Sequence, residues 1–173
     1  MVSVETTKAS DYKRIEEIYL DSFPKSERKP FPMLISGIKK GSAEMLSVFS
    51  DGTLCGFTYV YFHDGYALID YFAMAEIFRG KGTGSKAMKK ICERYKDRHV
   101  FLEIEQHSAG DIERRRMEFY RRCGYELCGI NVCLFGDDME LMTYKCGITK
   151  EDYIALYVDM TNNEFVLKNV IVK

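Results

Sequence analysis

The sequence has few features that interrupt a folded chain. It contains only three prolines in 173 residues, and no Pro/Gly/Ser-rich stretch, repeat or low-complexity segment divides it. One hydrophobic core commonly serves about 100 to 200 residues, and a chain of this mass hides roughly 70% of its extended surface on folding. These absences exclude a disordered chain, a mini-protein and a repeat array. They predict a single domain over residues 1–173.

Signals for metal binding, secretion and membrane insertion are also missing. The six cysteines form no CxxC pair and are accompanied by only three histidines, so neither a zinc site nor a redox motif is predicted. Residues 1–5 carry no basic segment followed by an apolar run, and the longest nearly charge-free stretch, residues 53–62, is about half the length that a membrane-spanning helix needs. We therefore expect a cytoplasmic protein with reduced thiols and no metal or membrane partner.

No charge of either sign dominates the whole chain. The 25 Lys and Arg residues nearly balance the 26 Asp and Glu residues, which gives a net charge of −1 and predicts no nucleic-acid partner. The distribution is uneven in one place. Between residues 79 and 90 there are five basic residues and no acidic one: Arg79, Lys81, Lys86, Lys89 and Lys90. This segment is expected to face an anion.

Hydrophobic periodicity and turn residues predict alternating helices and strands. Ser10 and Asp11 are placed to cap a helix that Pro24 ends, and residues 23–32 read as a loop. Asp51-Gly52 and Asp64-Gly65 are hairpin turns between strands. The predicted strands cover residues 2–6, 45–49, 54–62, 66–74, 100–105, 125–133, 140–144 and 165–172. The predicted helices run from about residues 12 to 23, 33 to 39, 87 to 95, 112 to 123 and 149 to 160, with Gly124 terminating the fourth.

These elements indicate an α/β (α+β) fold. The hairpins make an antiparallel meander, and the strand, helix and strand from residue 66 to residue 105 imply a right-handed parallel crossover. The predicted architecture is a central, mostly antiparallel mixed sheet with one parallel pair, flanked by helices.

The most specific motif lies between a predicted strand and a predicted helix. It comprises Arg79, Gly80, Lys81, Gly82, Thr83, Gly84 and Ser85. Alternate glycines let the backbone turn tightly with its amides exposed, and the following helix start adds unpaired N–H groups and positive potential. A plain strand-to-helix turn needs one glycine and has no use for the basic neighbours. The motif therefore predicts a phosphate-binding loop.

Two well-known phosphate loops fail on spacing. A dinucleotide fingerprint requires glycine at position 85, which is serine, and a P-loop requires Gly-Lys-Ser/Thr where residues 85–87 read Ser-Lys-Ala. The loop instead resembles the pyrophosphate loop of the GNAT superfamily of N-acetyltransferases, Arg/Gln-x-x-Gly-x-Gly/Ala, at Arg79, Gly82 and Gly84. The strand at residues 71–78 and the segment at residues 119–125 are similar to two further family signatures.

The resemblance spans roughly residues 2–144 and implies the GNAT-like acyl-CoA N-acyltransferase fold, whose parallel strand pair is splayed. Residues 145–173 are expected to form a helix-strand extension that completes either the sheet or a dimer interface. One position departs from the family pattern, because Glu113 occupies the site of an asparagine that commonly contacts the cofactor arm. The resemblance thus leaves the role of Glu113 in cofactor binding open.

The resemblance implies acetyl-CoA as cosubstrate, with no metal. The loop from Arg79 to Ser85 would hold the pyrophosphate, and backbone groups of Phe72, Ala73 and Met74 would pair with the pantetheine arm like an added strand. The Met74 amide would polarise the thioester carbonyl. The acceptor is expected to be a small-molecule or peptide amine, and the loop carrying Phe23, Glu27 and Arg28 is expected to help shape its pocket.

Acetyl transfer to an amine requires a proton acceptor and a proton donor. An amine of pKa ~10.4 costs about 4.6 kcal/mol to deprotonate at pH 7. Asp70 is the first candidate base because it shares a strand face with Phe72 and Met74, and Glu103 and Glu105 are the alternatives. Each carboxylate is also readily explained as an ordinary strand residue.

The departing thiolate needs a proton, and Tyr120 matches the family's general acid, although it also fits a core aromatic of its helix. No cysteine or histidine has a motif around it that would support a nucleophilic route.

The predicted function is direct N-acetylation from acetyl-CoA through a ternary complex. The alternatives are an acyl-CoA sensor or partner-binding module that keeps the loop without catalysis, and a phosphate-loop protein for another nucleotide, which the failed spacings disfavour. Exposed edge strands and the C-terminal extension are consistent with a homodimer.

Overall fold

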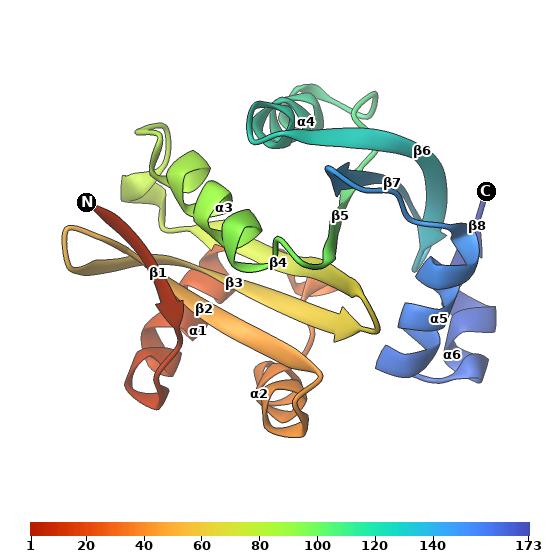
Figure 1. The fold of residues 1–173 in the computed structure, drawn as a ribbon, viewed down its shortest axis with the longest axis horizontal. Helices are drawn as coiled ribbons and strands as arrows, with labels where there is room; N and C mark the ends of the chain where they lie inside the picture. The colour runs from red at the N-terminus through yellow and green to blue at the C-terminus, as the bar shows by residue number, and fades with distance from the viewer. The chain divides into compact units, whose positions relative to one another are not determined.

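Eight strands and six α-helices make up the protein, and a computed structural model describes all 173 residues. The strands are ordered β1-β2-β3-β4-β5-β7-β6-β8 in a mixed sheet (Figure 1). They cover Val2–Thr6 (β1), Ala43–Ser50 (β2), Thr53–His63 (β3), Tyr66–Met74 (β4), His99–Glu105 (β5), Tyr125–Leu134 (β6), Asp137–Tyr144 (β7) and Val170–Val172 (β8). The helices cover Tyr12–Ser22 (α1), Phe31–Lys40 (α2), Thr83–Arg94 (α3), Asp111–Arg122 (α4), Lys150–Met160 (α5) and Asn163–Asn169 (α6).

The predicted fold class is confirmed. β4 and β5 are parallel, and their register pairs Tyr66–Leu68 with residues 99–101. The pairs β1–β2, β2–β3, β5–β7, β6–β7 and β6–β8 are antiparallel. Parallel pairing over only three residues of each strand is the short strand pair that the prediction placed in an otherwise antiparallel sheet.

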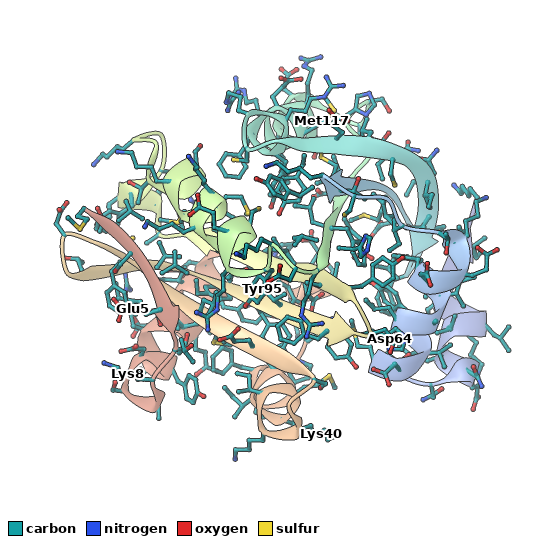
Figure 2. The ribbon with its side chains drawn as sticks, viewed as in Figure 1. Glu5, Lys8, Lys40, Asp64, Tyr95 and Met117 are labelled. Atoms are coloured by element: carbon teal, nitrogen blue, oxygen red, sulfur yellow. The ribbon has the colours of Figure 1, made fainter.

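The hairpin turns form where the sequence predicted them. Asp51 and Gly52 have φ angles of 49° and 80°, as a two-residue hairpin of the I′ type requires. Asp64, with φ of 47°, marks the turn between β3 and β4 (Figure 2). The Asp64 turn fixes the start of β4, which matches the predicted strand to the residue. β3 contains a bulge, since Val48 pairs with Gly56 and Phe49 with Leu54, which leaves Cys55 as the extra residue.

The chain forms two compact units. The first comprises residues 1–61 and 69–94, and the second comprises residues 62–68 and 95–173. In the first unit, α3 covers one face of the strands while α1 and α2 cover the other (Figure 1). Val48, Cys55, Met74 and Ala87 form a buried cluster beneath α3, and Tyr19 of α1 packs edge-on against Phe57 and Tyr71 on the opposite face.

In the second unit, α4 and α5 pack on opposite faces of the strands. Val100 and Tyr125 both pair with Tyr144, so these three residues share one face, and Tyr120 of α4 packs on the Tyr125 ring at 5.8 Å. Phe101 follows Val100 and therefore points to the other face, where its ring lies 6.3 Å from that of Tyr153 of α5.

Two sequence predictions are wrong. Residues 165–172 were predicted as a strand, but Asn163–Asn169 is helical and only Val170–Val172 is extended. The cause is a local cap, because the Asn162 side chain accepts a hydrogen bond of 2.8 Å from the Phe165 amide.

At the start of α1, a 3-10 turn over Ala9–Asp11 precedes the helix, and neither Ser10 nor Asp11 supplies the predicted side-chain cap. The Asp11 carboxylate instead accepts a hydrogen bond from Ser47 Oγ at 3.4 Å. None of the helices combines the length and apolar character needed to span a bilayer.

Candidate functional site

The loop after β4 leaves its backbone amides available. Gly80 and Gly82 have φ angles of 73° and 75°, in the left-handed region, and a Cβ added at either position would meet no atom within 4 Å. The Lys86 amide is the first to join the ladder of α3, through a 3.2 Å bond to the Gly82 carbonyl. The amides of residues 83–85 therefore have no partner within the helix. Together with the exposed lysines of this segment, they suit the oxygens of a phosphate.

Arg79 holds the start of this loop in place. Its Nε donates to the Met74 carbonyl at 2.8 Å, and its terminal nitrogen donates to Ser22 Oγ at 3.1 Å. The guanidinium thus connects the loop to the end of β4 and to the last residue of α1. We interpret the side chain as a structural brace of the loop, while the loop amides remain available for a ligand.

The end of β4 packs closely against β3. A Cβ at Gly56 would lie 2.5 Å from the Ala73 carbonyl oxygen and 2.6 Å from Met74 Sδ, so only glycine allows this approach. Phe72 and Met74 pack in the cluster beneath α3. Tyr71 points to the opposite face, as strand alternation predicts. The Ala75 amide bonds the Cys55 carbonyl at 2.8 Å, which fixes where β4 ends.

Asp70 is held in an ion pair. Lys29 Nζ lies 2.6 Å from Asp70 Oδ2, with side-chain exposures of 28% and 9% respectively. Lys29 was not among the predicted site residues. It lies in the predicted 23–32 loop, but no local pattern connects it with a strand residue 41 positions later.

The 24–30 segment is attached to β4 through Tyr71. The Tyr71 hydroxyl donates to the Glu27 carbonyl at 2.8 Å and accepts from the Lys29 amide at 3.2 Å. Burial raises the pKa of the Tyr71 phenol well above its usual range, so it remains a donor. Phe23 packs on the Tyr71 ring at 5.0 Å, and Arg28 reaches the Leu20 carbonyl at 3.5 Å. The three predicted acceptor residues thus belong to one tethered loop, in which Glu27 contributes its backbone and leaves its side chain exposed.

The two carboxylates of β5 have different partners. Glu105 forms an ion pair with Arg116 of α4. Glu103 accepts a hydrogen bond of 2.6 Å from the Tyr153 hydroxyl and bonds of 2.8 and 3.0 Å from the Tyr157 hydroxyl. Neither tyrosine was predicted as a site residue. Their spacing of four residues on a capped helix was the available signal, but it does not identify the carboxylate that they bind.

Tyr120 presents a protonated phenol on α4. The side chain is half-buried, and its ring packs on Phe119 at 5.1 Å and on Tyr125 at 5.8 Å. Burial raises the pKa of Tyr120 to about 12, against the opposing influence of the Arg116 guanidinium. A phenol with this pKa keeps its proton at neutral pH and can donate it. The Glu113 carboxylate turns back over Gly110 at the start of the same helix.

The predicted residues divide between the two units. Asp70, Phe72–Met74, the 79–85 loop and the Phe23–Arg28 segment belong to the first unit, while Glu103, Glu105, Glu113 and Tyr120 belong to the second. Within the first unit, Lys29 brings Asp70 together with the loop that was predicted to shape the acceptor pocket. Within the second, Glu103 and Tyr120 lie on opposite faces of the strands, because Glu103 shares the face of Phe101. All six cysteines are free thiols.

Comparisons with known proteins concern the family and the fold of the chain. The model of the acetyltransferase (GNAT) family matches residues 12–125. A Bacteroides thetaiotaomicron protein assigned to the GNAT-family acetyltransferases superposes with a TM-score of 0.79 at 25% identity, over 94% of this chain and 98% of that one. No curated protein sequence matches.

More distant structures share the fold. A Bacillus subtilis acetyltransferase in complex with CoA has a TM-score of 0.66 at 14% identity, over 84% of this chain and 99% of that one. The ribosomal-protein-S18-alanine N-acetyltransferase of Escherichia coli has a TM-score of 0.65 at 14% identity, over 88% and 98% of the two chains.

Proposed function

Because the chain belongs to the GNAT family of acetyltransferases, we propose that it transfers the acetyl group of acetyl-CoA to a primary amine. The observation that carries the proposal is the open loop at the start of α3. Gly80 and Gly82 are in the left-handed region, nothing fills the space above them, and the first amides of α3 lack helix partners. Such amides fit the pyrophosphate of coenzyme A.

The residues before the loop suit the rest of the cofactor. We assign the backbone of Phe72, Ala73 and Met74 to the pantetheine arm, which would add to β4 as an extended strand. Acetyl-CoA supplies the acetyl group as a thioester, and the Met74 amide would stabilise negative charge on the thioester oxygen. Arg79 supports both assignments, since its guanidinium holds the Met74 carbonyl.

Proton transfer is assigned to four side chains. Tyr120 is the proposed acid, because its position matches the family's general acid and its hydroxyl is protonated at neutral pH. Asp70, Glu103 and Glu105 are the candidate bases for the acceptor ammonium. Asp70 would act as a base only when its contact with Lys29 is exchanged for the acceptor.

The acceptor is proposed to be a small-molecule or peptide amine. Relatives of the same fold include the enzyme named for the alanine of ribosomal protein S18 and a chimera of spermidine N-acetyltransferase from Vibrio cholerae. We assign the tethered loop of Phe23, Glu27 and Arg28 to acceptor selection. The free thiols suit a reducing cytoplasm, and β1 and β8, the two edge strands, offer surfaces for a homodimer.

The first test is the melting temperature with acetyl-CoA, with NAD and ATP as controls. A ligand specific for the native state adds about 2.7 kcal/mol at one hundred times its dissociation constant, which corresponds to several degrees for a domain of this size. We expect a shift with acetyl-CoA alone. An equal shift with ATP, or none with acetyl-CoA, would refute the assignment of the loop.

The second test is thiol release with a panel of amines comprising spermidine, an alanine-terminated peptide, free lysine and ethanolamine. Amine-dependent release of coenzyme A is expected for an enzyme, whereas tight binding without turnover would assign the protein to the sensor alternative. If Asp70 is the base, Asp70→Asn should lower turnover while preserving acetyl-CoA binding. An unchanged pH–rate profile in this variant would remove Asp70 from the role of base.

A further inference from the structure

The C-terminal helix α5 delivers two buried hydroxyls to a strand carboxylate. Tyr153 and Tyr157 are 0% and 3% exposed, and both donate to Glu103, at 2.6 Å and at 2.8 and 3.0 Å. A buried phenol needs a hydrogen-bond partner, and here two phenols share one. The arrangement fixes both oxygens of the carboxylate, which accept from the two phenols.

The helix that carries these tyrosines is independently anchored. Thr149 caps α5 by accepting from the Asp152 amide at 3.1 Å, and the Tyr66 hydroxyl donates to the Asp152 carboxylate at 2.7 Å. The Tyr153 ring also packs on Phe101 and on Tyr157. The rings and the cap therefore account for the placement of α5. In addition to this packing, the two tyrosine hydroxyls of α5 orient the Glu103 carboxylate.

Glu103 and Tyr120 occupy opposite faces of the second unit. Tyr120 packs on the face of Tyr125 and Tyr144, whereas Glu103 shares the face of Phe101 and α5. An acid for the leaving sulfur and a base for the incoming nitrogen serve two atoms on different sides of the carbonyl carbon, so two opposed faces suit them. The matched family segment ends at residue 125, so α5 lies beyond it.

We propose that Glu103 is the base that takes the acceptor proton and that Tyr153 and Tyr157 are its positioning residues. The inference rests on the proposed function. In the step, the acceptor reacts as the neutral amine, and its nitrogen forms a bond to the acetyl carbon as the carbon–sulfur bond breaks. The proton of the attacking nitrogen goes to Glu103, and the thiolate takes a proton from Tyr120. The C-terminal extension is thereby part of the catalytic arrangement.

The test is a double-mutant cycle between Glu103 and Tyr157. The assay follows coenzyme A release at saturating acetyl-CoA, with the panel amine that wild type acetylates fastest. We expect Glu103→Gln to lower kcat about 100-fold, within the range of general base catalysis, and Tyr157→Phe to lower it about tenfold with acetyl-CoA affinity unchanged. In the Glu103→Gln background, Tyr157→Phe should lower kcat no further, because the phenol acts through the carboxylate.

Tyr66→Phe is the matched control. It removes a hydroxyl that binds α5 at Asp152 and does not contact Glu103, so kcat should stay within about twofold of wild type. Tyr153→Phe provides a second positioning variant should Tyr157→Phe unfold.

The outcomes separate this inference from the proposed function. If Tyr157→Phe and Tyr66→Phe have equal effects on kcat, or if Tyr157→Phe is as damaging without Glu103 as with it, the positioning role is refuted while acetyl transfer stands. If wild type releases no coenzyme A with any panel amine, the proposed enzyme function fails, and the base assignment fails with it.

Discussion

The loop at residues 79–85 and the acidic side chains of β4 and β5 are built in opposite ways. The loop leaves its groups open, since Gly80 and Gly82 face empty space and the first amides of α3 lack helix partners. The three carboxylates are all engaged, Asp70 by Lys29, Glu105 by Arg116 and Glu103 by two tyrosines. Binding groups supplied by the backbone need no side-chain partner to hold their direction, whereas flexible carboxylates do.

The difference shows where substitutions should act. Changes in the loop should alter cofactor affinity with little effect on the chemical step. Changes around the acidic side chains and Tyr120 should alter turnover or stability while the cofactor still binds.

The largest expected effect is a loss of turnover at Tyr120 without a loss of cofactor binding. Tyr120→Phe keeps the ring that packs on Tyr125 and removes the hydroxyl, so kcat should fall about 100-fold, as loss of a general acid typically requires. The acetyl-CoA dissociation constant, measured by calorimetry, should change less than about twofold, because the loop is untouched. Wild-type turnover in this variant would eliminate Tyr120 as the acid.

The second largest effect is expected on stability, when the Lys29–Asp70 ion pair is broken. Lys29→Met leaves a nearly buried carboxylate without its ammonium partner. The expected loss is about 2 kcal/mol of unfolding free energy, between the values for exposed and buried pairs, measured by urea titration. Lys25→Met, in the same loop and exposed, is the control and should cost under about 0.5 kcal/mol. Equal losses would show that the pair contributes nothing specific.

Two glycines with the same backbone conformation test whether the 79–85 loop binds the cofactor through its amides. Gly82 and Gly41 have φ angles of 75° and 76°, and both face open space. Alanine at either position should cost about 1 to 2 kcal/mol of stability. Only Gly82→Ala should weaken acetyl-CoA binding, by about tenfold, because relief of the strain turns the loop amides away. Equal dissociation constants for the two variants would contradict an amide-based site.

The smallest effect is a pH dependence. The pKa of Tyr120 is raised to about 12 in the folded protein, against ~10 in an unfolded chain. The folded state therefore binds more protons between pH 10 and 12, and stability is lost as the pH rises through that interval. Tyr120→Phe should make the loss shallower by ~1 kcal/mol per pH unit, measured by urea unfolding at stepped pH. An unchanged slope would indicate an ordinary phenol.

Local signals explain how much of the fold was predictable. The start of β4 was predicted to the residue because the Asp64-Gly65 turn fixes it, and Gly124, with φ of 94°, ends α4 as expected. The C-terminal strand prediction failed because the apolar run at residues 165–172 satisfies strand and helix patterns alike. The Asn162 cap favours the helix, which continues to Asn169.

The site was predictable only in its backbone part. Alternate glycines between a strand and a helix determine the local backbone conformation. The phosphate-binding loop could therefore be predicted from the sequence. The partners of Asp70 and Glu103 lie 41 and about 50 residues away in the chain. Periodicity places each carboxylate on a face, but it cannot say which distant side chain meets it there.

The Tyr71 hydroxyl bears on how this enzyme scaffold could be redesigned. It bonds the backbone at Glu27 and at Lys29, so the shape of the loop is set partly by a residue of β4. A loop transplanted from a relative with a different residue at this position would lose both anchors. Transplanting the 24–30 segment together with position 71, as one module, should carry its conformation into the recipient protein.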